Sequence, residues 1–166
     1  MIKIHSFLDS WMKESLSKNT PDDIEKATML NNLAGLHCQT KQYRKAEKEY
    51  RKALKIRKQL TEENLVDCEA YVAETLKNLG VLHDNKKQYA QAEKELNEAL
   101  AIYRRLAAEN PAAHQADVAM TLNNLGLLHA NTNQYPKAEE EYNEALEIHR
   151  RLAASIPPPP PRTSWM

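Results

Sequence analysis

The chain has 166 residues, 28% of them charged, and its formal net charge is zero. This length is sufficient for a domain with a hydrophobic core, and the balanced charge argues against a protein that binds nucleic acid through its overall charge. Only three glycines are present, and the many Ala, Leu, Glu, Lys and Arg residues predict an all-α fold. The charge is nevertheless uneven. Residues 1–60 carry 13 Lys and Arg against 7 Asp and Glu, a net +6, and residues 61–166 carry 10 against 16, a net −6.

The sequence contains no apolar stretch long enough to span a bilayer, and its N-terminus lacks the features of a secretory signal peptide. The two cysteines, Cys38 and Cys68, are too far apart in sequence to form a metal-binding or redox pair of the Cys-x-x-Cys kind. We therefore expect a cytoplasmic protein with reduced thiols and no cofactor, which binds neither membranes nor nucleic acid.

The first predicted element is a helix that covers one end of the fold. In the segment 3–18, apolar residues recur at helical spacing on one face: Ile4, Phe7, Leu8, Trp11 and Leu16. Residues 1–19 are therefore predicted to form a leading capping helix. Thr20 and Pro21 favour the start of the next helix, because threonine caps helices and proline suits their first turn.

The chain from there to residue 154 contains three copies of one sequence unit. A motif such as Asn124-Leu-Gly-Leu-Leu-His129 occurs three times at a constant step of 46 residues. Between the second and third copies, about two-thirds of the positions from Val72 to Ala108 are identical. A constant period of this kind indicates a repeat array, in which neighbouring units bury each other's apolar faces. The predicted repeats are about 20–64, 65–110 and 111–154.

Each repeat is predicted to be a pair of antiparallel helices joined by a tight turn at a Gln-Tyr dipeptide. The first helices are expected at about 22–40, 66–86 and 112–132, and the second helices at about 43–63, 89–109 and 135–154.

Close packing within a pair is expected at Gly80 and Gly126, which lack a Cβ and allow the second helix to approach. In the first repeat, Ala34 stands at this register and Gly35 follows one residue later, so slightly wider packing is expected there. The small residues expected to meet these glycines are Ala92, Ala99, Ala138 and Ala145.

These repeats resemble tetratricopeptide repeats, whose signature combines Leu-Gly with aromatic and alanine positions. The repeated motif is most similar to the kinesin-light-chain-like branch of that family. It reads Thr-Leu-Asn-Asn-Leu-Gly-Leu-Leu-His, followed by Tyr-x-x-Ala-Glu. The period of 46 exceeds the family's usual length of about 34, so longer helices are expected. The signature positions are occupied here by Leu79-Gly80, His83, Ala92, Leu96 and Ala99.

The resemblance implies an α-solenoid that binds a peptide or protein segment in a concave groove lined by the first helices. Transferred by register, the implied groove positions of the first repeat are Asn31, Asn32, Gly35 and Cys38, with Thr28 and Gln39 beside them. Those of the second repeat are Glu74, Lys77, Asn78, Val81, Asp84 and Asn85. Those of the third repeat are Met120, Asn123, Asn124, Leu127 and Asn131, with Ala130 beside them.

Three groove asparagines, Asn32, Asn78 and Asn124, recur at one register. An amide side chain both donates and accepts, so a column of asparagines suits a peptide backbone whatever its sequence. The same amides could instead bond the neighbouring helix and fix the stacking of the repeats. Both interpretations remain open at this point. A clamp for a terminal carboxylate is disfavoured, because Lys77 is the only cation among the groove positions.

Catalytic and metal-binding chemistry find little support in the sequence. The column of His37, His83 and His129 sits on neighbouring helices too far apart for one metal ion, and partly buried histidines in place of aromatics are expected instead. Cys38 has no evident base beside it. The acidic residues of the last helix are assigned to a solvated face paired with Lys and Arg: Glu139, Glu140, Glu141, Glu144 and Glu147. No catalytic residue and no metal site is therefore predicted.

The second helix of the first repeat is strongly basic, which favours a protein contact or solubility over nucleic-acid binding because no aromatic platform accompanies it. The basic residues counted here are Lys41, Arg44, Lys45, Lys48, Arg51, Lys52, Lys55, Arg57 and Lys58. Residues 155–166 leave the repeat pattern and contain five consecutive prolines, which favour an extended tail or a ligand for a proline-binding groove.

Three functions are considered for this chain. The leading hypothesis is a non-enzymatic adaptor that binds a protein or peptide. The alternative is a structural scaffold that assembles with itself through its ends, because the last repeat has no following helix to cover it. A sensor domain of a larger regulator is a third possibility.

Overall fold

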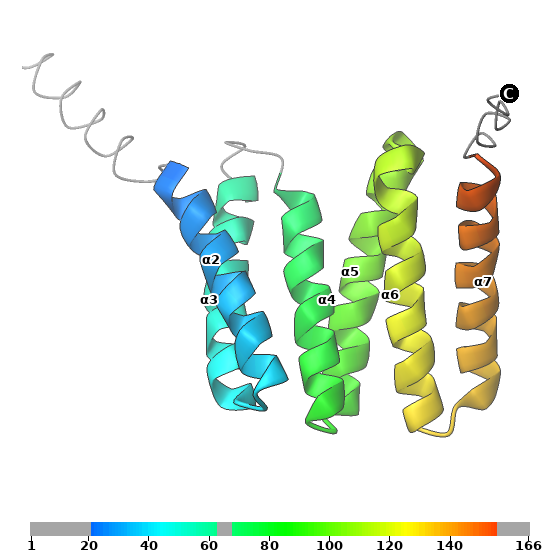
Figure 1. Ribbon diagram of the computed structural model, residues 1–166, viewed down its shortest axis with the longest axis horizontal. Coiled ribbons are helices and arrows are strands. Elements are labelled where there is room, and N and C mark those ends of the chain that lie inside the picture. The colour runs from blue at the N-terminus through cyan, green and yellow to red at the C-terminus, as the bar shows by residue number, and fades with distance from the viewer. Residues whose placement is uncertain (1–20, 63–67, 156–166) are drawn as a thin grey trace, which may run out of the picture. The chain divides into compact units, whose positions relative to one another are not determined.

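The computed structural model describes residues 21–62 and 68–155. The predicted capping helix at 1–19 and all of the predicted Pro-rich tail except Ser155 lie outside the described residues. The regular structure of the described residues is entirely helical (Figure 1), which confirms the predicted all-α class. The helices are α2 (Pro21–Gln39), α3 (Tyr43–Glu62), α4 (Glu69–Asn85), α5 (Tyr89–Glu109), α6 (Pro111–Asn131) and α7 (Tyr135–Ala154).

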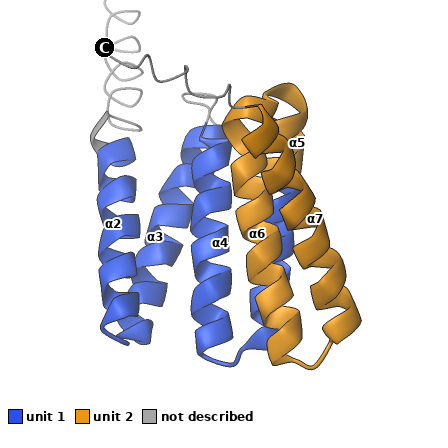
Figure 2. Cartoon of the chain, turned by 45° about the vertical axis from the view of Figure 1, so that its right-hand side comes forward, with its two compact units in different colours: residues 1–102 blue, residues 103–166 orange. Residues whose placement is uncertain are grey.

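The chain divides into two compact units, residues 1–102 and residues 103–166, with the division falling inside α5 (Figure 2). Most predicted helix boundaries lie within about two residues of the observed ones. The exception is α4, which begins at Glu69 rather than at the predicted residue 66. Cys68 precedes α4 without a capping hydrogen bond from its side chain, so no local signal in the sequence marks that start.

The tight turns within the three pairs share one backbone motif. Lys41, Lys87 and Asn133 stand at the same register and adopt left-handed conformations, with φ of 57°, 58° and 60°. In the first turn, the Gln42 amide donates to the His37 carbonyl at 2.8 Å and the Lys41 amide donates to the Cys38 carbonyl at 3.0 Å. These two hydrogen bonds together form the Schellman motif, which satisfies the last carbonyls of a helix and reverses the chain.

The core of the first unit lies where α2, α3 and α4 meet. Its central cluster is formed by small residues of α2 and α3, the ring of Tyr50, and two leucines of α4: Ala34, Ala46, Tyr50, Leu79 and Leu82. Because alanines stand between the larger side chains, the helices interdigitate at close range.

A buried arginine also joins α3 to α4. Arg57 is only 3% exposed, and its Nη1 donates to the Tyr71 carbonyl at 2.8 Å and to Thr75 Oγ1 at 2.6 Å. Its guanidinium lies 5.2 Å from the centre of the Tyr71 ring. Arg57 is one of the basic residues counted on this helix, but its guanidinium is held inside by acceptors from α4 and does not contribute to a basic surface.

In the second unit, α6 and α7 pack through apolar residues on one side of each helix. Leu122, Leu125 and Leu128 of α6 are about 1% exposed, and Ala145 and Ile148 of α7 are also buried. Other apolar side chains of α7 remain exposed, with Tyr142 40% exposed and Leu146 46% exposed.

The two glycines in the middle of first helices do accommodate close neighbours. A Cβ at Gly80 would lie 2.6 Å from Leu96 Cγ and 3.2 Å from the Ala92 carbonyl oxygen, and one at Gly126 would lie 2.8 Å from the ring of Tyr142. The prediction of close approach is confirmed, but large side chains, rather than the small alanines alone, fill the space. At Gly35 the nearest atom would be Tyr50 Oη at 3.7 Å, so nothing there requires glycine.

Candidate functional site

The groove positions of the first unit divide into exposed and buried residues. Val81 is 38% exposed, and Asn32 and Asn85 are also exposed, as are Thr28 and Gln39 beside them. Gly35, Cys38, Glu74, Asn78 and Asp84 are half-buried. Asn31 and Lys77 are buried, with 6% and 9% of their surfaces exposed, so they offer a ligand little area.

One predicted groove asparagine contacts its neighbour on the adjacent first helix. Asn78 Nδ2 of α4 donates to Asn31 Oδ1 of α2 at 3.4 Å, a long hydrogen bond. This contact supports the stacking interpretation at Asn78. At Asn32, which is exposed on α2, no bond given by the structure decides between stacking and peptide binding.

In the second unit, the groove positions of α6 form an exposed stripe. Met120 and Leu127 are 48% and 51% exposed, and Asn123 and Asn131 are exposed on the same helix. Asn124 and the adjoining Ala130 are half-buried. Spacings of three and four residues place Met120, Asn123 and Leu127 on one face of the helix. A groove that runs across all three first helices stays a prediction.

Each helix pair contains a histidine–glutamate bridge, which the sequence analysis did not identify. The Nδ1 atoms of the three histidines lie within 2.7 Å of a carboxylate twelve residues later on the second helix of the pair. The bridges are His37–Glu49 at 2.6 Å, His83–Glu95 at 2.6 Å and His129–Glu141 at 2.7 Å. The expectation of partly buried histidines is confirmed, since His83 and His129 are buried and His37 is half-buried. They are polar links between helices as well as packing residues.

The sequence did contain a signal for these bridges, because Glu49, Glu95 and Glu141 share the period of 46 with the histidines. The assignment of Glu141 to the solvated face is wrong, since its side chain is 18% exposed and bonded to His129. That assignment is confirmed for Glu144, which pairs with Arg104 at 2.7 Å, and for Glu147, which lies 3.9 Å from Arg151.

A second polar link joins neighbouring pairs in the first unit. Glu47 of α3 accepts a hydrogen bond from Lys86, which follows α4, at 2.5 Å, and lies 3.5 Å from His83 Nε2. The hydrogen bond from Lys86, helped by one from Arg51, lowers the pKa of Glu47 from its ordinary 4.5 to about 2. The buried His83 therefore has a carboxylate on each side, Glu47 of α3 and Glu95 of α5.

The depressed pKa of Glu47 predicts a loss of stability in acid. Glu47 contributes stability that is fully present above its unfolded pKa of about 4.5 and is lost as the pH falls through about 2. Because the pair is partly exposed, we expect a contribution of about 1 kcal/mol. Urea unfolding at about pH 7 and about pH 2 should show that Lys86→Met loses this part of the pH dependence. Lys87→Met, a matched change of an exposed neighbour, should keep it; identical pH profiles for both variants would refute the assignment.

The Cys38 thiol is half-buried against α3. Burial raises its pKa and the charge of Glu49 adds to this, whereas a hydrogen bond with Tyr50 opposes it. A raised pKa disfavours the thiolate, which is the nucleophilic form of cysteine.

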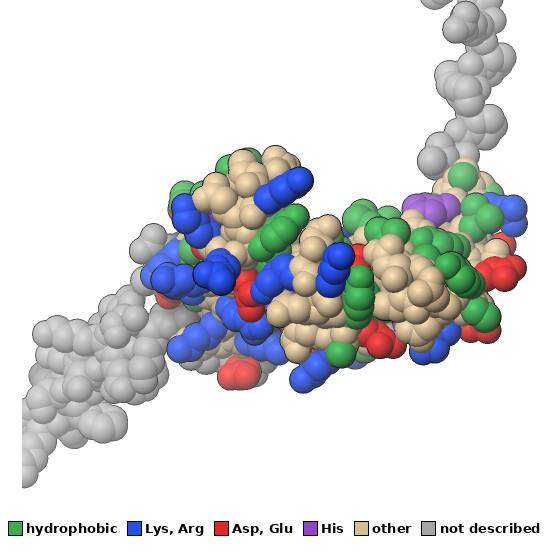
Figure 3. Space-filling view, turned by 90° about the horizontal axis from the view of Figure 1, so that it is seen from below, with side chains coloured by type: hydrophobic (Ala, Val, Ile, Leu, Met, Phe, Trp, Pro, Cys, Tyr) green, Lys and Arg blue, Asp and Glu red, His purple; other side chains and the backbone are tan. Residues whose placement is uncertain are grey.

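Basic side chains gather where α2 turns into α3, as seen in the space-filling view (Figure 3). A depression of about 510 Å³ lies here, lined by Lys41, Gln42, Tyr43, Arg44, Lys45 and Lys86.

No group of three or more His, Cys, Asp or Glu side chains within residues 21–62 and 68–155 could hold a metal ion. In the same part of the chain, every helix is too short or too polar to cross a membrane.

The period, the helix pairs and the shared turn motif define this chain as an α-helical repeat protein. The tetratricopeptide repeat family model matches residues 25–105 and again residues 71–151, and the chain belongs to this family. The curated proteins compared with the chain include no match.

Among solved structures, the chain is similar to BtubC (BKLC) from P. vanneervenii, with a TM-score of 0.64 and 30% sequence identity. The similarity covers 84% of this chain but only 53% of BtubC, so the chain spans about half the length of that protein. Together with the family match, this neighbour confirms the predicted kinesin-light-chain-like branch of the tetratricopeptide repeats.

Proposed function

We propose that this chain is a non-enzymatic module that binds a peptide segment of another protein on the exposed faces of its first helices. Tetratricopeptide repeats generally mediate protein–protein interaction, which supports the general class of function. The observation that carries the proposal is the stripe on α6, where Met120 and Leu127 are about half exposed on either side of Asn123. Exposed apolar side chains beside polar ones are typical of an interaction surface.

The composition of this surface indicates the kind of ligand. Met120 and Leu127 suit an apolar anchor, because burying such side chains contributes about 1.5–3 kcal/mol each. Asn123, exposed between them on α6, suits the backbone groups of an extended or helical segment. Since Lys77 is buried, it is not part of the proposed contact surface. The ligand is therefore recognised through an apolar side chain and its backbone rather than through an acidic group.

The test is selection of binders from displayed random peptides with the whole chain as bait, followed by calorimetric titration of single peptides. We expect selected peptides to share an apolar residue, and Leu127→Ala or Asn123→Ala to weaken binding about tenfold or more, equivalent to about 1.4 kcal/mol. The control is Glu140→Ala on α7, an exposed change outside the proposed surface. Circular dichroism should show that all variants remain folded. If Glu140→Ala abolishes binding and Leu127→Ala does not, the binding surface lies on the second helices.

Self-assembly is a second candidate function, favoured by the exposed apolar side chains of α7. Tyr142 and Leu146 are 40% and 46% exposed, whereas Leu96 and Leu100, which stand one period earlier, are 1% and 6% exposed. The net charges of +6 for residues 1–60 and −6 for residues 61–166 suit a contact between unlike ends of two copies. Oligomeric state in solution is its direct test.

A further inference from the structure

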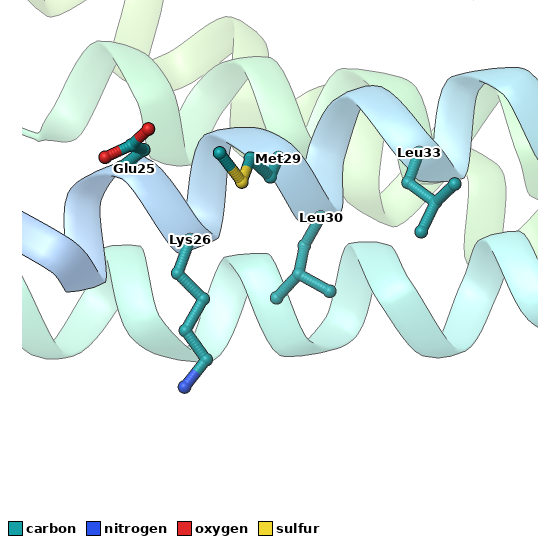
Figure 4. Close-up of a pocket in the computed structure, with 5 residues that line it drawn as sticks. All are labelled: Glu25, Lys26, Met29, Leu30 and Leu33. Atoms are coloured by element: carbon teal, nitrogen blue, oxygen red, sulfur yellow. The ribbon is translucent and has the colours of Figure 1, made fainter.

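Helix α2, the first helix of the first pair, has one apolar face that is exposed. Met29, Leu33 and Leu36 are 60%, 43% and 58% exposed. An open depression of about 550 Å³ runs along this helix, and its lining side chains follow one another on α2 (Figure 4): Glu25, Lys26, Met29, Leu30 and Leu33. Large apolar side chains in such a row indicate a missing neighbour.

The same positions one period later are covered. Thr75, Leu79 and Leu82 of α4 correspond to Met29, Leu33 and Leu36, and none of the three has measurable exposure. Helix α3, which comes immediately before α4 in the chain, provides the cover. Tyr50 packs in one cluster with Leu79 and Leu82, and Arg57 donates to Thr75 Oγ1 at 2.6 Å.

The sequence places a corresponding segment directly before α2. Subtracting 46 from the α3 positions puts Ile4 at the register of Tyr50, Leu8 at that of Leu54 and Trp11 at that of Arg57. We propose that residues 3–18 form a helix that packs on the open face of α2 in the way that α3 packs on α4. As a helix this segment would be about 24 Å long, close to the length of about 28 Å for α2.

The proposed register matches residue types on both sides. Ile4 is placed against Leu33 and Leu36, as Tyr50 is against Leu79 and Leu82. The polar contact of Arg57 with Thr75 becomes an apolar contact of Trp11 with Met29. Arg57 corresponds to Trp11 and Thr75 corresponds to Met29, so both members of the pair change from polar to apolar. Such a paired change is expected if the two positions are in contact in both repeats. Sulfur–aromatic contacts of this kind are favourable in protein cores.

Tryptophan fluorescence tests the proposal on the full chain. The chain has two tryptophans, so Trp165→Phe leaves Trp11 as the only tryptophan whose emission is measured. We expect blue-shifted emission from Trp11, weak quenching by iodide and no dependence on protein concentration. The double change Leu33→Glu with Leu36→Glu should shift the emission to that of exposed tryptophan and increase iodide quenching severalfold. Leu127→Glu on α6 is the control with a similarly exposed leucine and should change neither measurement.

A disulfide provides a second test that does not depend on a destabilising change. In a Cys38→Ala background, Ile4→Cys with Leu36→Cys should form an intrachain bond on oxidation, whereas Ile4→Cys with Leu127→Cys should not. Emission of exposed tryptophan in the parent protein, or absence of the first disulfide, would overturn the proposal. So would emission that depends on concentration and is shifted by Leu146→Glu, because a second copy would then cover α2.

Discussion

Replacing Glu95 by Ala is expected to destabilise the folded chain by about 3–5 kcal/mol, the largest effect of any change considered. The Glu95 carboxylate is 4% exposed and accepts from His83 Nδ1 at 2.6 Å and from Gln91 Nε2 at 2.8 Å. Because His83 is only 1% exposed, water cannot replace the lost acceptor. Urea unfolding followed by circular dichroism measures the change.

Three matched variants separate the bridge from simple loss of volume. Glu95→Gln keeps an acceptor for the imidazole and should be milder than Glu95→Ala. Glu49→Ala removes the equivalent bridge of the first pair, where His37 and Glu49 are 20% and 16% exposed, and should cost less because water can solvate the imidazole. The double change His83→Phe with Glu95→Leu should recover part of the loss, since it removes both polar partners. Equal costs for Glu95→Ala and Glu49→Ala would show that burial of the bridge does not govern its contribution.

Adding a single methyl group at the three glycines is expected to give effects of different size and sign. Gly80→Ala should cost about 2–3 kcal/mol, because the new Cβ meets Leu96 Cγ at 2.6 Å and the Ala92 carbonyl at 3.2 Å. Gly126→Ala should cost less, about 1 kcal/mol, because the ring of Tyr142 is 40% exposed and has room to move outward. Gly35→Ala should stabilise by about 0.5–1 kcal/mol, since alanine favours the helix and meets nothing closer than 3.7 Å.

The order of the three effects is the decisive result, and thermal or urea unfolding of the three variants measures it. All three residues are helical and have ordinary negative φ, so helix propensity favours alanine by a similar amount in each case. The differences between the variants therefore report packing alone. Stabilisation by Gly80→Ala would mean that α4 and α5 are farther apart than the structure has them.

The period of 46 made the helices predictable from sequence. A repeated motif assigns the same structure to three segments, so a weak local signal in one copy is strengthened by the others. The turns, the close approach at Gly80 and the family all followed from this repetition. The start of α4 could not be predicted as well, because Cys68 provides no cap by its side chain.

Exposure of the candidate site was harder to predict than its register. Lys77 and Asn31 stand at groove positions, yet they are 9% and 6% exposed. Sequence spacing gives the face of a helix on which a residue lies, whereas burial depends on how far the neighbouring helix extends over that face. Arg57 illustrates the same limit, since its burial depends on the Tyr71 carbonyl and Thr75 of the next helix.

Carboxylate pairing was missed for a related reason. Glu141 stands among four other acidic residues of α7, and such density usually indicates a solvated face. Only the imidazole of His129, brought close by the turn between α6 and α7, distinguishes Glu141 from its neighbours. Its recurrence with Glu49 and Glu95 at the period of the histidines was the one signal available.

The position of His83 between two carboxylates has a consequence for folding cooperativity. In a repeat protein, stability is the sum of a term intrinsic to each repeat and a term for each interface between neighbours. His83 contributes to both terms, since it bonds Glu95 within its own pair and lies 3.5 Å from Glu47 of the preceding pair. Separating α3 from α4 thus removes Glu47 from the imidazole of His83, which also bonds Glu95 and so links α4 to α5. The interface between these pairs is therefore energetically coupled to the packing inside the second pair. We expect the two to unfold together rather than independently.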